Sequence, residues 1–321
     1  MPGARRAGAG PTERMTKVLY IAGWGRSGST LLDQILGGLE GWFSCGELKS
    51  LWHPVPCGCG SPVADCEFWS RIADRTPSRF PLRSRARRGA TARGYVNDAK
   101  PWDFAAVARA RRRGPSPDSP QWRHAKAVSG LYDTIAAETG ARVIVDSSKL
   151  ATHAYLIATM TDVELYIVHL VRDPRATAHS WTRRKARDPS GSTYMPNLGP
   201  AASSMHWLTR NALIDLWLRR LPDVPYRRLR YEDLVADPRG AVRSIRELLG
   251  EPGEDGFAGD RTVRLRAHHM IGGNPRKFET GEIRVNPDKE WESAMPMGSR
   301  IRATVPALPL LHRYGYPVRP G

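Results

Sequence analysis

Short apolar runs alternate along this chain with segments whose apolar residues recur every three or four positions. The apolar runs predict buried strands at Lys17–Gly23, Arg142–Asp146, Leu165–Val171 and Tyr226–Tyr231. The helical spacing predicts helices at about Thr30–Gly38, Ala151–Met160, Ala176–Lys185, Ala202–Arg220 and Arg239–Leu249. Strands that alternate with helices in this way are typical of an α/β fold. We therefore expect a mostly parallel central sheet that is flanked by helices on both faces.

Single residues refine two of these helices. Pro174 fits the first turn of the helix after Leu165–Val171, and Gly250 is expected to end the helix Arg239–Leu249. In the longest helix we expect five residues to face the core: Trp207, Leu208, Leu213, Leu216 and Trp217. The chain contains no internal repeat.

The alternation lapses between Leu48 and Ala141, and this stretch contains two runs of arginine. The runs consist of Arg83, Arg85, Arg87, Arg88 and Arg93, then Arg109, Arg111, Arg112 and Arg113. We interpret about 49–141 as an irregular basic insertion that forms a cap or flexible loops, or a solvated linker. Residues 1–15 predict a disordered tail or an over-extended start. The expected organisation is then one α/β domain over 16–321.

The net positive charge of the chain indicates which classes of binding partner to expect. The 49 Lys and Arg residues against 32 Asp and Glu residues give a net charge of +17, which favours an anionic ligand, a nucleic acid or a negatively charged surface. Genomic composition is an equally good explanation, because many of the arginines lie in Gly/Ala/Pro-rich stretches. No zinc-finger, helix-turn-helix or RNA-binding aromatic signature is present, so we expect no nucleic-acid partner. Without an apolar run of about 18 residues, we expect no membrane span and a cytoplasmic protein. The oligomeric state is not indicated.

The most informative stretch is Val18–Leu32, in which an apolar strand runs into a glycine-rich turn and a helix start. Such a turn binds phosphate, because its backbone N–H groups and the helix dipole converge on one point. Gly23, Gly28 and Thr30 fit the Walker A template G-x-x-x-x-G-K-[ST], but Ser29 stands in place of the lysine. That lysine reaches the β/γ-phosphates of a triphosphate. A loop that carries Arg26 instead suits a shorter anhydride.

A second stretch, His169–Trp181, places charged residues at the carboxyl end of a buried strand, where open α/β sheets collect ligands. Arg172 at the strand end, Ser180 on the following helix and Arg184 one turn further can hold a second phosphate. A structural ion pair between Arg172 and Asp173 is the alternative.

Together the two stretches resemble the sulfotransferases that use 3′-phosphoadenosine 5′-phosphosulfate (PAPS). Gly25–Thr30 is similar to the family's 5′-phosphosulfate loop and Leu170–Ser180 to its 3′-phosphate motif. Tyr231–Pro238 and His269–Trp291 extend the resemblance, which covers roughly Lys17–Glu47 and Asp146–Trp291. The Arg-Ser-Gly in the loop is closest to the branch of tyrosylprotein and carbohydrate sulfotransferases. Such an enzyme has a P-loop-type α/β fold.

The resemblance implies a set of donor-binding residues. The 5′-phosphosulfate would contact the loop residues Gly25, Arg26, Ser27, Gly28, Ser29 and Thr30. The 3′-phosphate would contact Arg172, Ser180, Arg184 and, in a looser match, Arg276, while Tyr231 would contact adenine. PAPS would be the sulfuryl donor, with no metal required. The acceptor would be a hydroxyl of a small molecule, glycan or lipid, selected by the 48–141 stretch and the Asp188–Gly199 loop.

In-line transfer also needs a group that stabilises the leaving oxygen and a base for the acceptor hydroxyl. Arg26 suits the first role. Glu47 is our expected base, because Cys45-Gly-Glu-Leu48 is similar to a catalytic Cys-Gly-Glu-Glu segment of the tyrosylprotein branch. His53 is the alternative base, and either residue can instead be a satisfied or exposed polar group. Asp146–Lys149 is expected to shape the site, with Lys149 near the sulfuryl group or acceptor and Ser147 or Ser148 capping a helix.

All four cysteines lie in one window, at Cys45, Cys57, Cys59 and Cys66. The last three can bind zinc or form a staple, but their spacing differs from paired C-x-x-C sites, and we expect free thiols near the acceptor entrance.

Two other functions stay open on the sequence. An ATP-dependent P-loop kinase is weakened by Ser29 and by the lack of a magnesium-binding carboxylate motif. A nucleic-acid-binding protein would explain the charge alone.

Overall fold

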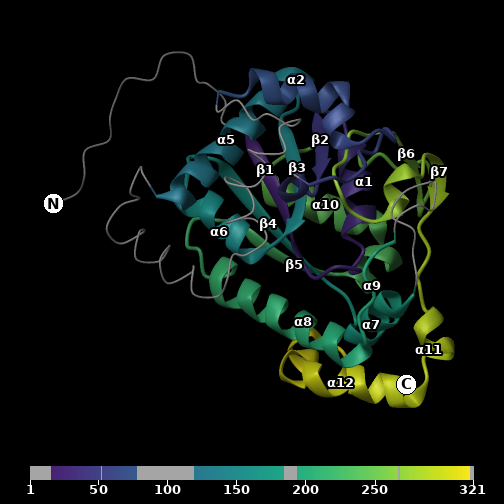
Figure 1. Cartoon of the computed structure of the whole chain (residues 1–321). Coiled ribbons are helices and arrows are strands. Elements are labelled where there is room, and N and C mark those ends of the chain that lie inside the picture. The colour runs from purple at the N-terminus through teal and green to yellow at the C-terminus, as the bar shows by residue number, and fades with distance from the viewer. Residues whose placement is uncertain (1–15, 52, 78–118, 184–193, 267, 319–321) are drawn as a thin grey trace.

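The computed structural model describes residues 16–51, 53–77, 119–183, 194–266 and 268–318. Its centre is a sheet of five strands in the order β2-β3-β1-β4-β5, in which all neighbours pair in parallel (Figure 1). The strands are β1 Lys17–Gly23, β2 Trp42–Gly46, β3 Val143–Lys149, β4 Glu164–Val171 and β5 Tyr226–Arg230. The predicted α/β class with a parallel sheet is confirmed.

Each face of the sheet packs on its own core. Val18, Tyr20 and Ala22 of β1 pack with helices α2, α5 and α6, whereas Leu19 and Ile21 pack with α1, α9 and α10 (Figure 1). These helices are α1 Ser29–Gly37, α2 Glu67–Arg75, α5 Pro120–Thr139, α6 Ala151–Met160, α9 Tyr231–Ala236 and α10 Pro238–Leu249. A strand that is apolar on both faces has to be covered on both faces, which explains the three layers.

Two of these helices lie inside the stretch that the sequence led us to expect as irregular. The segment 67–75 forms α2, and α5 crosses from β2 to β3 with five buried residues at helical spacing: Ala125, Val128, Leu131, Tyr132 and Ile135. Ser119 caps α5 by accepting a hydrogen bond from the backbone N–H of Trp122 (3.2 Å). Both arginine runs of the predicted insertion fall in 78–118, outside the described residues.

A third group of helices packs around the carboxyl end of β4. It contains α7 Pro174–Thr182, α8 Pro200–Leu213 with a π-helical turn at Ile214–Leu218, α11 Glu290–Ala294 and α12 Met297–Leu311 (Figure 1).

The predicted core face of α8 is partly wrong, because Leu216 is 46% exposed. The buried stripe runs instead through Trp207, Asn211, Ile214 and Leu218. Asn211 belongs to it because its side-chain oxygen is hydrogen-bonded to Nε2 of the buried His169 on β4 (2.7 Å).

The chain between α10 and α11 returns to the sheet edge. β6 Thr262–Leu265 and β7 Gly281–Arg284 pair antiparallel, and the connection between them extends back to the end of β2. There the N–H of Ile271 donates to Cys45 O (2.9 Å) and the N–H of Glu47 donates to Ile271 O (2.7 Å). Short 3-10 turns complete the description at Leu48–Ser50, Val63–Asp65, Pro275–Phe278 and His312–Tyr314. None of the described helices is long and apolar enough to cross a bilayer.

Candidate active site

The carboxyl ends of all five parallel strands meet around one cavity of about 490 Å³. Each strand end contributes to its lining: the glycine-rich loop follows β1, Glu47 follows β2, Lys149 ends β3, Arg172 follows β4 and Tyr231 follows β5. Parallel strands place their carboxyl ends on one edge, so residues far apart in the sequence converge here. The cavity lining includes ten of the sequence-predicted site residues: Gly25, Arg26, Gly28, Ser29, Thr30, Glu47, Arg172, Ser180, Tyr231 and Arg276.

Close packing explains two glycines of the loop. A Cβ at Gly25 would lie 2.7 Å from the Trp181 ring, and a Cβ at Gly28 would lie 2.5 Å from the Tyr231 ring. Gly28 also has a φ of 89°, in the left-handed region that favours glycine. Gly28 is the N-cap residue of α1, and no side chain caps this helix start. The backbone therefore approaches the cavity closely, as a loop that binds an anion with its N–H groups requires.

Arg26 lies within this loop and combines a left-handed backbone conformation with a buried guanidinium group. Its φ is 68°, its guanidinium lies 4.9 Å from the Trp181 ring centre, and its three guanidinium nitrogens are buried without a hydrogen-bond partner among the described residues. Burial lowers the pKa of Arg26 to about 10 although the Glu47 carboxylate opposes the shift, so the group stays charged at neutral pH. A buried cation whose N–H groups have no hydrogen-bond acceptor in the described part of the chain is suited to an anion that enters the cavity.

Arg172 is held at the other side of the loop. Its guanidinium donates to Arg26 O (3.2 Å), pairs with Asp288 (3.1 Å) and lies 4.3 Å from the Tyr231 ring centre. The indole of Trp207 on α8 fixes its backbone by donating to Arg172 O (2.9 Å).

The alternative pairing of Arg172 with Asp173 is not what the structure shows. Asp173 instead caps α7 by accepting from the Arg175 N–H (2.8 Å), and it pairs with the Arg175 guanidinium (2.6 Å).

Three more of the residues predicted to bind phosphate, Ser27, Ser180 and Arg276, lie in or near the glycine-rich loop and the cavity. Ser180 on α7 is buried and borders the cavity. Arg276 borders it from the loop after Asn274, whose N–H donates to the Thr30 hydroxyl (3.2 Å), and Arg276 pairs with Glu279 (3.2 Å). Ser27 is buried within the loop, and its hydroxyl has no hydrogen-bond partner in the described part of the chain. Arg184 lies outside the described residues.

Glu47 faces two lysines across the cavity. Lys149 Nζ donates to Glu47 Oε1 (2.6 Å), and Lys49 Nζ lies 3.3 Å from Oε2. Burial on its own would raise the pKa of Glu47, but the two ammonium groups lower it to about 2. The carboxylate is therefore ionised at any physiological pH. His53, the alternative base, is not among the residues that line the cavity.

Lys149, whose role the sequence left open, borders the cavity and has an unusual backbone conformation. Its φ of 71° makes it, with Arg26, one of only two non-glycine residues with positive φ in the described ranges. Both side chains border the same cavity, and strained backbone is commonly retained at functional sites.

The expected helix cap beside Lys149 is wrong. Leu150 precedes α6, and no side chain caps that helix. Ser147 and Ser148 belong to β3, where Ser147 donates to the buried Asp33 and Ser148 accepts from the Lys49 N–H. These bonds hold the end of β3 against α1 and the Leu48–Ser50 turn.

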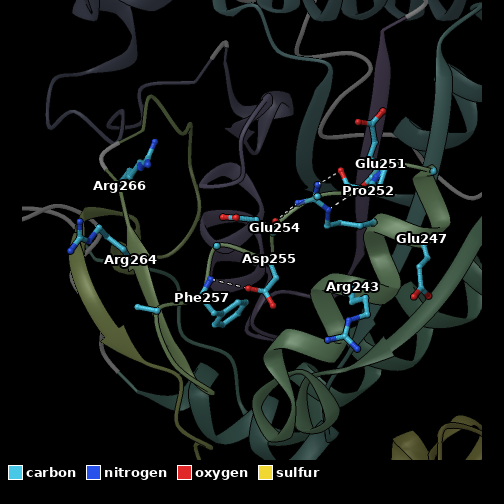
Figure 2. A pocket seen from close by; sticks show the side chains of 14 residues that line it. Arg243, Glu247, Glu251, Pro252, Glu254, Asp255, Phe257, Arg264 and Arg266 are labelled. Atoms are coloured by element: carbon cyan, nitrogen blue, oxygen red, sulfur yellow. Dashed lines mark hydrogen bonds between the residues drawn. The ribbon is translucent and has the colours of Figure 1, made fainter.

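A larger pocket of about 940 Å³ lies elsewhere, between α10, the loop 250–258 and β6 (Figure 2). Arg246 there donates to Glu251 O (2.8 Å) and Pro252 O (2.6 Å), so its guanidinium serves to hold the loop. Lys17, the first residue of β1, pairs with Glu251 (2.9 Å), which places this pocket toward the amino ends of the strands. None of the sequence-predicted site residues lines it.

Fold and cavity together define an α/β protein with a buried cationic site at the carboxyl edge of a parallel sheet. The model of the sulfotransferase family matches residues 19–255, well over half of the chain. The chain belongs to the sulfotransferase family, which confirms the family-level resemblance and identifies a transferase. No curated protein sequence matches the chain significantly.

Solved structures agree with the fold. The sulfotransferase domain of the olefin synthase from Synechococcus PCC 7002 is 20% identical, with 98% of this chain and 99% of that chain covered and a TM-score of 0.51. The sulfotransferase domain from the curacin biosynthetic pathway is 18% identical, with 96% and 100% covered and a TM-score of 0.52. At these identities the likeness shows the shared fold alone.

Proposed function

We propose that the protein transfers the sulfuryl group of PAPS to a hydroxyl acceptor in the cavity at the ends of β1–β5. The observation that carries this proposal is the buried Arg26 guanidinium without a hydrogen-bond partner in the described ranges, beside a glycine-rich loop and an uncapped helix start. Membership of the sulfotransferase family supports sulfotransfer over phosphotransfer. A cavity of about 490 Å³ is in the usual range for a small-molecule site.

The donor would lie across the loop. In this arrangement the backbone N–H groups of 27–30 and the Arg26 guanidinium bind the 5′-phosphosulfate, and Arg172 and Ser180 bind the 3′-phosphate. Tyr231 contacts adenine, and Arg276 adds a further phosphate contact. Support comes from the placement of these side chains on the lining of one cavity.

In the transfer step the acceptor oxygen attacks sulfur, and the bond between sulfur and the bridging phosphate oxygen breaks. Adenosine 3′,5′-bisphosphate leaves with the electron pair, and the acceptor proton passes to a base. Arg26 stabilises the charge that grows on the bridging oxygen. The reacting groups must be held in line for this displacement.

Glu47 is the base that we favour over His53, because Glu47 borders the cavity. A carboxylate with a pKa of about 2 is a weak base while Lys149 and Lys49 pair with it. We infer that the bound sulfuryl oxygens attract these ammonium groups. Glu47 is thereby released to accept the acceptor proton, and Lys149 stabilises the group in transfer.

The acceptor would enter beside Trp181, Met195 and Pro196, which line the cavity from α7 and from the loop that we expected to select acceptors. Arg210 adds a cation from α8. A small-molecule, glycan or lipid hydroxyl fits this mixed apolar and cationic wall. Acceptor determinants were predicted in Leu48–Ala141 and Asp188–Gly199, and of these stretches 78–118 and 188–193 lie outside the described residues.

A screen of alcohols, phenols and sugars with sulfur-labelled PAPS tests the proposal, with the labelled product identified by mass spectrometry. We expect a sulfated product from the full chain and about 10²–10⁴ times less from Glu47→Gln at equal concentration, while Arg75→Gln, which changes a surface ion pair with Glu138, keeps the activity. Phosphorylation of acceptors from ATP and Mg²⁺, with no transfer from PAPS, would instead establish the kinase alternative.

A further inference from the structure

Three of the four cysteines meet a histidine from a distant part of the chain. Cys57, Cys59 and Cys66 lie near His269, and the three sulfur atoms and one ring nitrogen all lie within 4.8 Å of one another. Cys57 and Cys66 are buried, Cys59 is exposed and His269 is half-buried. The fourth cysteine, Cys45, is separate and donates to Val145 O.

Three of the six distances between these atoms are those of a tetrahedral zinc centre. Zinc bonds of about 2.3 Å to sulfur and 2.05 Å to nitrogen give edges of about 3.8 Å between sulfurs and about 3.6 Å between sulfur and nitrogen. The observed edges are 3.8 Å for Cys59 to Cys66, and 3.4 Å and 3.7 Å from His269 Nδ1 to Cys66 and Cys57. A disulfide needs sulfurs about 2.05 Å apart.

The backbone around the cluster is folded to face the sulfurs. Backbone N–H groups of Cys59, Ser61 and Trp69 lie close to the sulfur atoms of Cys57, Cys59 and Cys66, respectively. Thiolates are the form of cysteine that binds a metal.

Two glycines make this turn possible. Gly58 lies so close to His268 O that no Cβ fits, and Gly60 has a φ of 94°. The geometry of the turn therefore accounts for the glycine that follows each of the two cysteines.

The histidine is oriented by its own neighbours. Its ring stacks on Phe68 at 4.6 Å with an interplanar angle of 9°, and the Trp69 indole donates to His269 O (2.7 Å). A zinc ion with three thiolates and one neutral imidazole carries a net charge of −1. Arg71 lies close enough to act electrostatically on His269, with the sign that balances this charge.

We propose that Cys57, Cys59, Cys66 and His269 bind one structural Zn²⁺. Four protein ligands close the coordination sphere, as in structural rather than catalytic zinc sites. The sequence alone favoured free thiols, because the cysteine spacing differs from paired C-x-x-C sites, and it did not indicate His269 as a fourth ligand. The proposal does not depend on the identity of the sulfuryl donor.

The position of the ion suggests what it does. It would tie the turn at 57–60 to the segment after His269, and that segment holds the end of β2 through Ile271 and borders the cavity through Gly273 and Asn274. Zinc would thus fix the wall of the cavity that supports Glu47.

Metal analysis of the full chain tests the site. The protein is produced in zinc-supplemented medium and purified without chelator or a histidine tag, and its metal is measured by plasma mass spectrometry. We expect about one zinc per chain, and none in Cys66→Ser or His269→Ala. Cys45→Ala is the matched control, since it removes a cysteine outside the cluster and is expected to keep the metal.

A second readout covers variants that fail to fold. Cobalt exchanged into the wild-type protein should give the intense visible bands of a tetrahedral site and a thiolate charge-transfer band. Wild-type protein that contains no zinc and takes up no cobalt would overturn the proposal. This holds whether intact-mass measurement shows free thiols or the loss of two hydrogens that marks a disulfide. Zinc that persists in both Cys66→Ser and His269→Ala would also overturn it.

Discussion

Replacing Arg26 by glycine should stabilise the protein while it slows the reaction. Arg26 has a φ of 68°, where a residue with a Cβ is strained by about 1–2 kcal/mol and glycine is not. The greater freedom of glycine in the unfolded chain offsets about 0.4–1 kcal/mol of this gain. Loss of a buried guanidinium that has no hydrogen-bond partner in the described structure adds to stability. The net gain is about 1 kcal/mol, or roughly 2 °C in Tm for a chain of this size.

The rate should change in the opposite direction. A preorganised donor aimed at the developing charge contributes about 10²–10³ in kcat, so Arg26→Gly should lower kcat by that factor. Arg26→Ala should lose the same rate without the gain in stability from relieved strain, because alanine keeps a Cβ at this φ. Arg26→Lys keeps the charge but not the planar fork, and it should retain part of the rate.

Thermal unfolding by calorimetry and turnover of an acceptor from the PAPS screen measure the two effects. If Arg26→Gly lowered both kcat and the free energy of unfolding, Arg26 would support the structure of the loop rather than the reaction. An unchanged kcat in Arg26→Gly would remove Arg26 from the mechanism.

Three further predictions follow from neighbouring groups. Glu47→Gln should lower kcat by about 10²–10⁴ while the affinity for adenosine 3′,5′-bisphosphate stays equal or improves, because two lysines are freed; weaker nucleotide binding, measured by calorimetry, would contradict this. Gly28→Ala, with φ of 89° and the Tyr231 ring in the way, should cost about 1–3 kcal/mol of unfolding free energy, and a denaturation curve equal to wild type would refute the crowding. Burial raises the pKa of Asp33 from 3.8 to about 7 against the hydrogen bonds of two serines. The folded state therefore holds its proton more tightly, and on the order of 4 kcal/mol of stability present below pH 4 is lost as pH rises to about 7. Asp33→Asn should flatten that part of the pH–stability curve, and an unaltered slope would contradict the assignment.

Local sequence patterns predicted the elements that are apolar on their own. β1 has the predicted bounds, and the helix at 151–160 was also found as predicted, because their residues are buried almost throughout. β2 was missed, since Trp42–Gly46 is only five residues long and ends in the Cys-Gly that the sequence assigned to a motif. α5 was missed although its buried residues have helical spacing, because the neighbouring arginine runs dominate the composition of that region.

Part of the cavity could also be predicted, from the order of the strands. Strand ends in a parallel sheet share an edge, so the glycine-rich loop and Arg172 could be placed together from the order of elements. The partners of each side chain could not be predicted. Asp288 pairs with Arg172 from a distant loop, and His269 joins the cysteines across some 200 positions of sequence. Such contacts depend on how the chain returns to the sheet edge after β6, which no local pattern encodes.

The central claim is that this cavity binds a nucleotide with both a 5′ and a 3′ anionic group, and one calorimetric experiment tests it most directly. Wild type and Arg172→Gln are each titrated with adenosine 3′,5′-bisphosphate, with adenosine 5′-monophosphate and with ATP plus Mg²⁺. A charge-assisted contact contributes about 1.5–3 kcal/mol, so the account predicts that Arg172→Gln weakens bisphosphate binding about 10- to 150-fold and leaves monophosphate binding nearly unchanged. Equal weakening for both adenosine nucleotides, or a preference of the wild type for ATP with Mg²⁺, would contradict it.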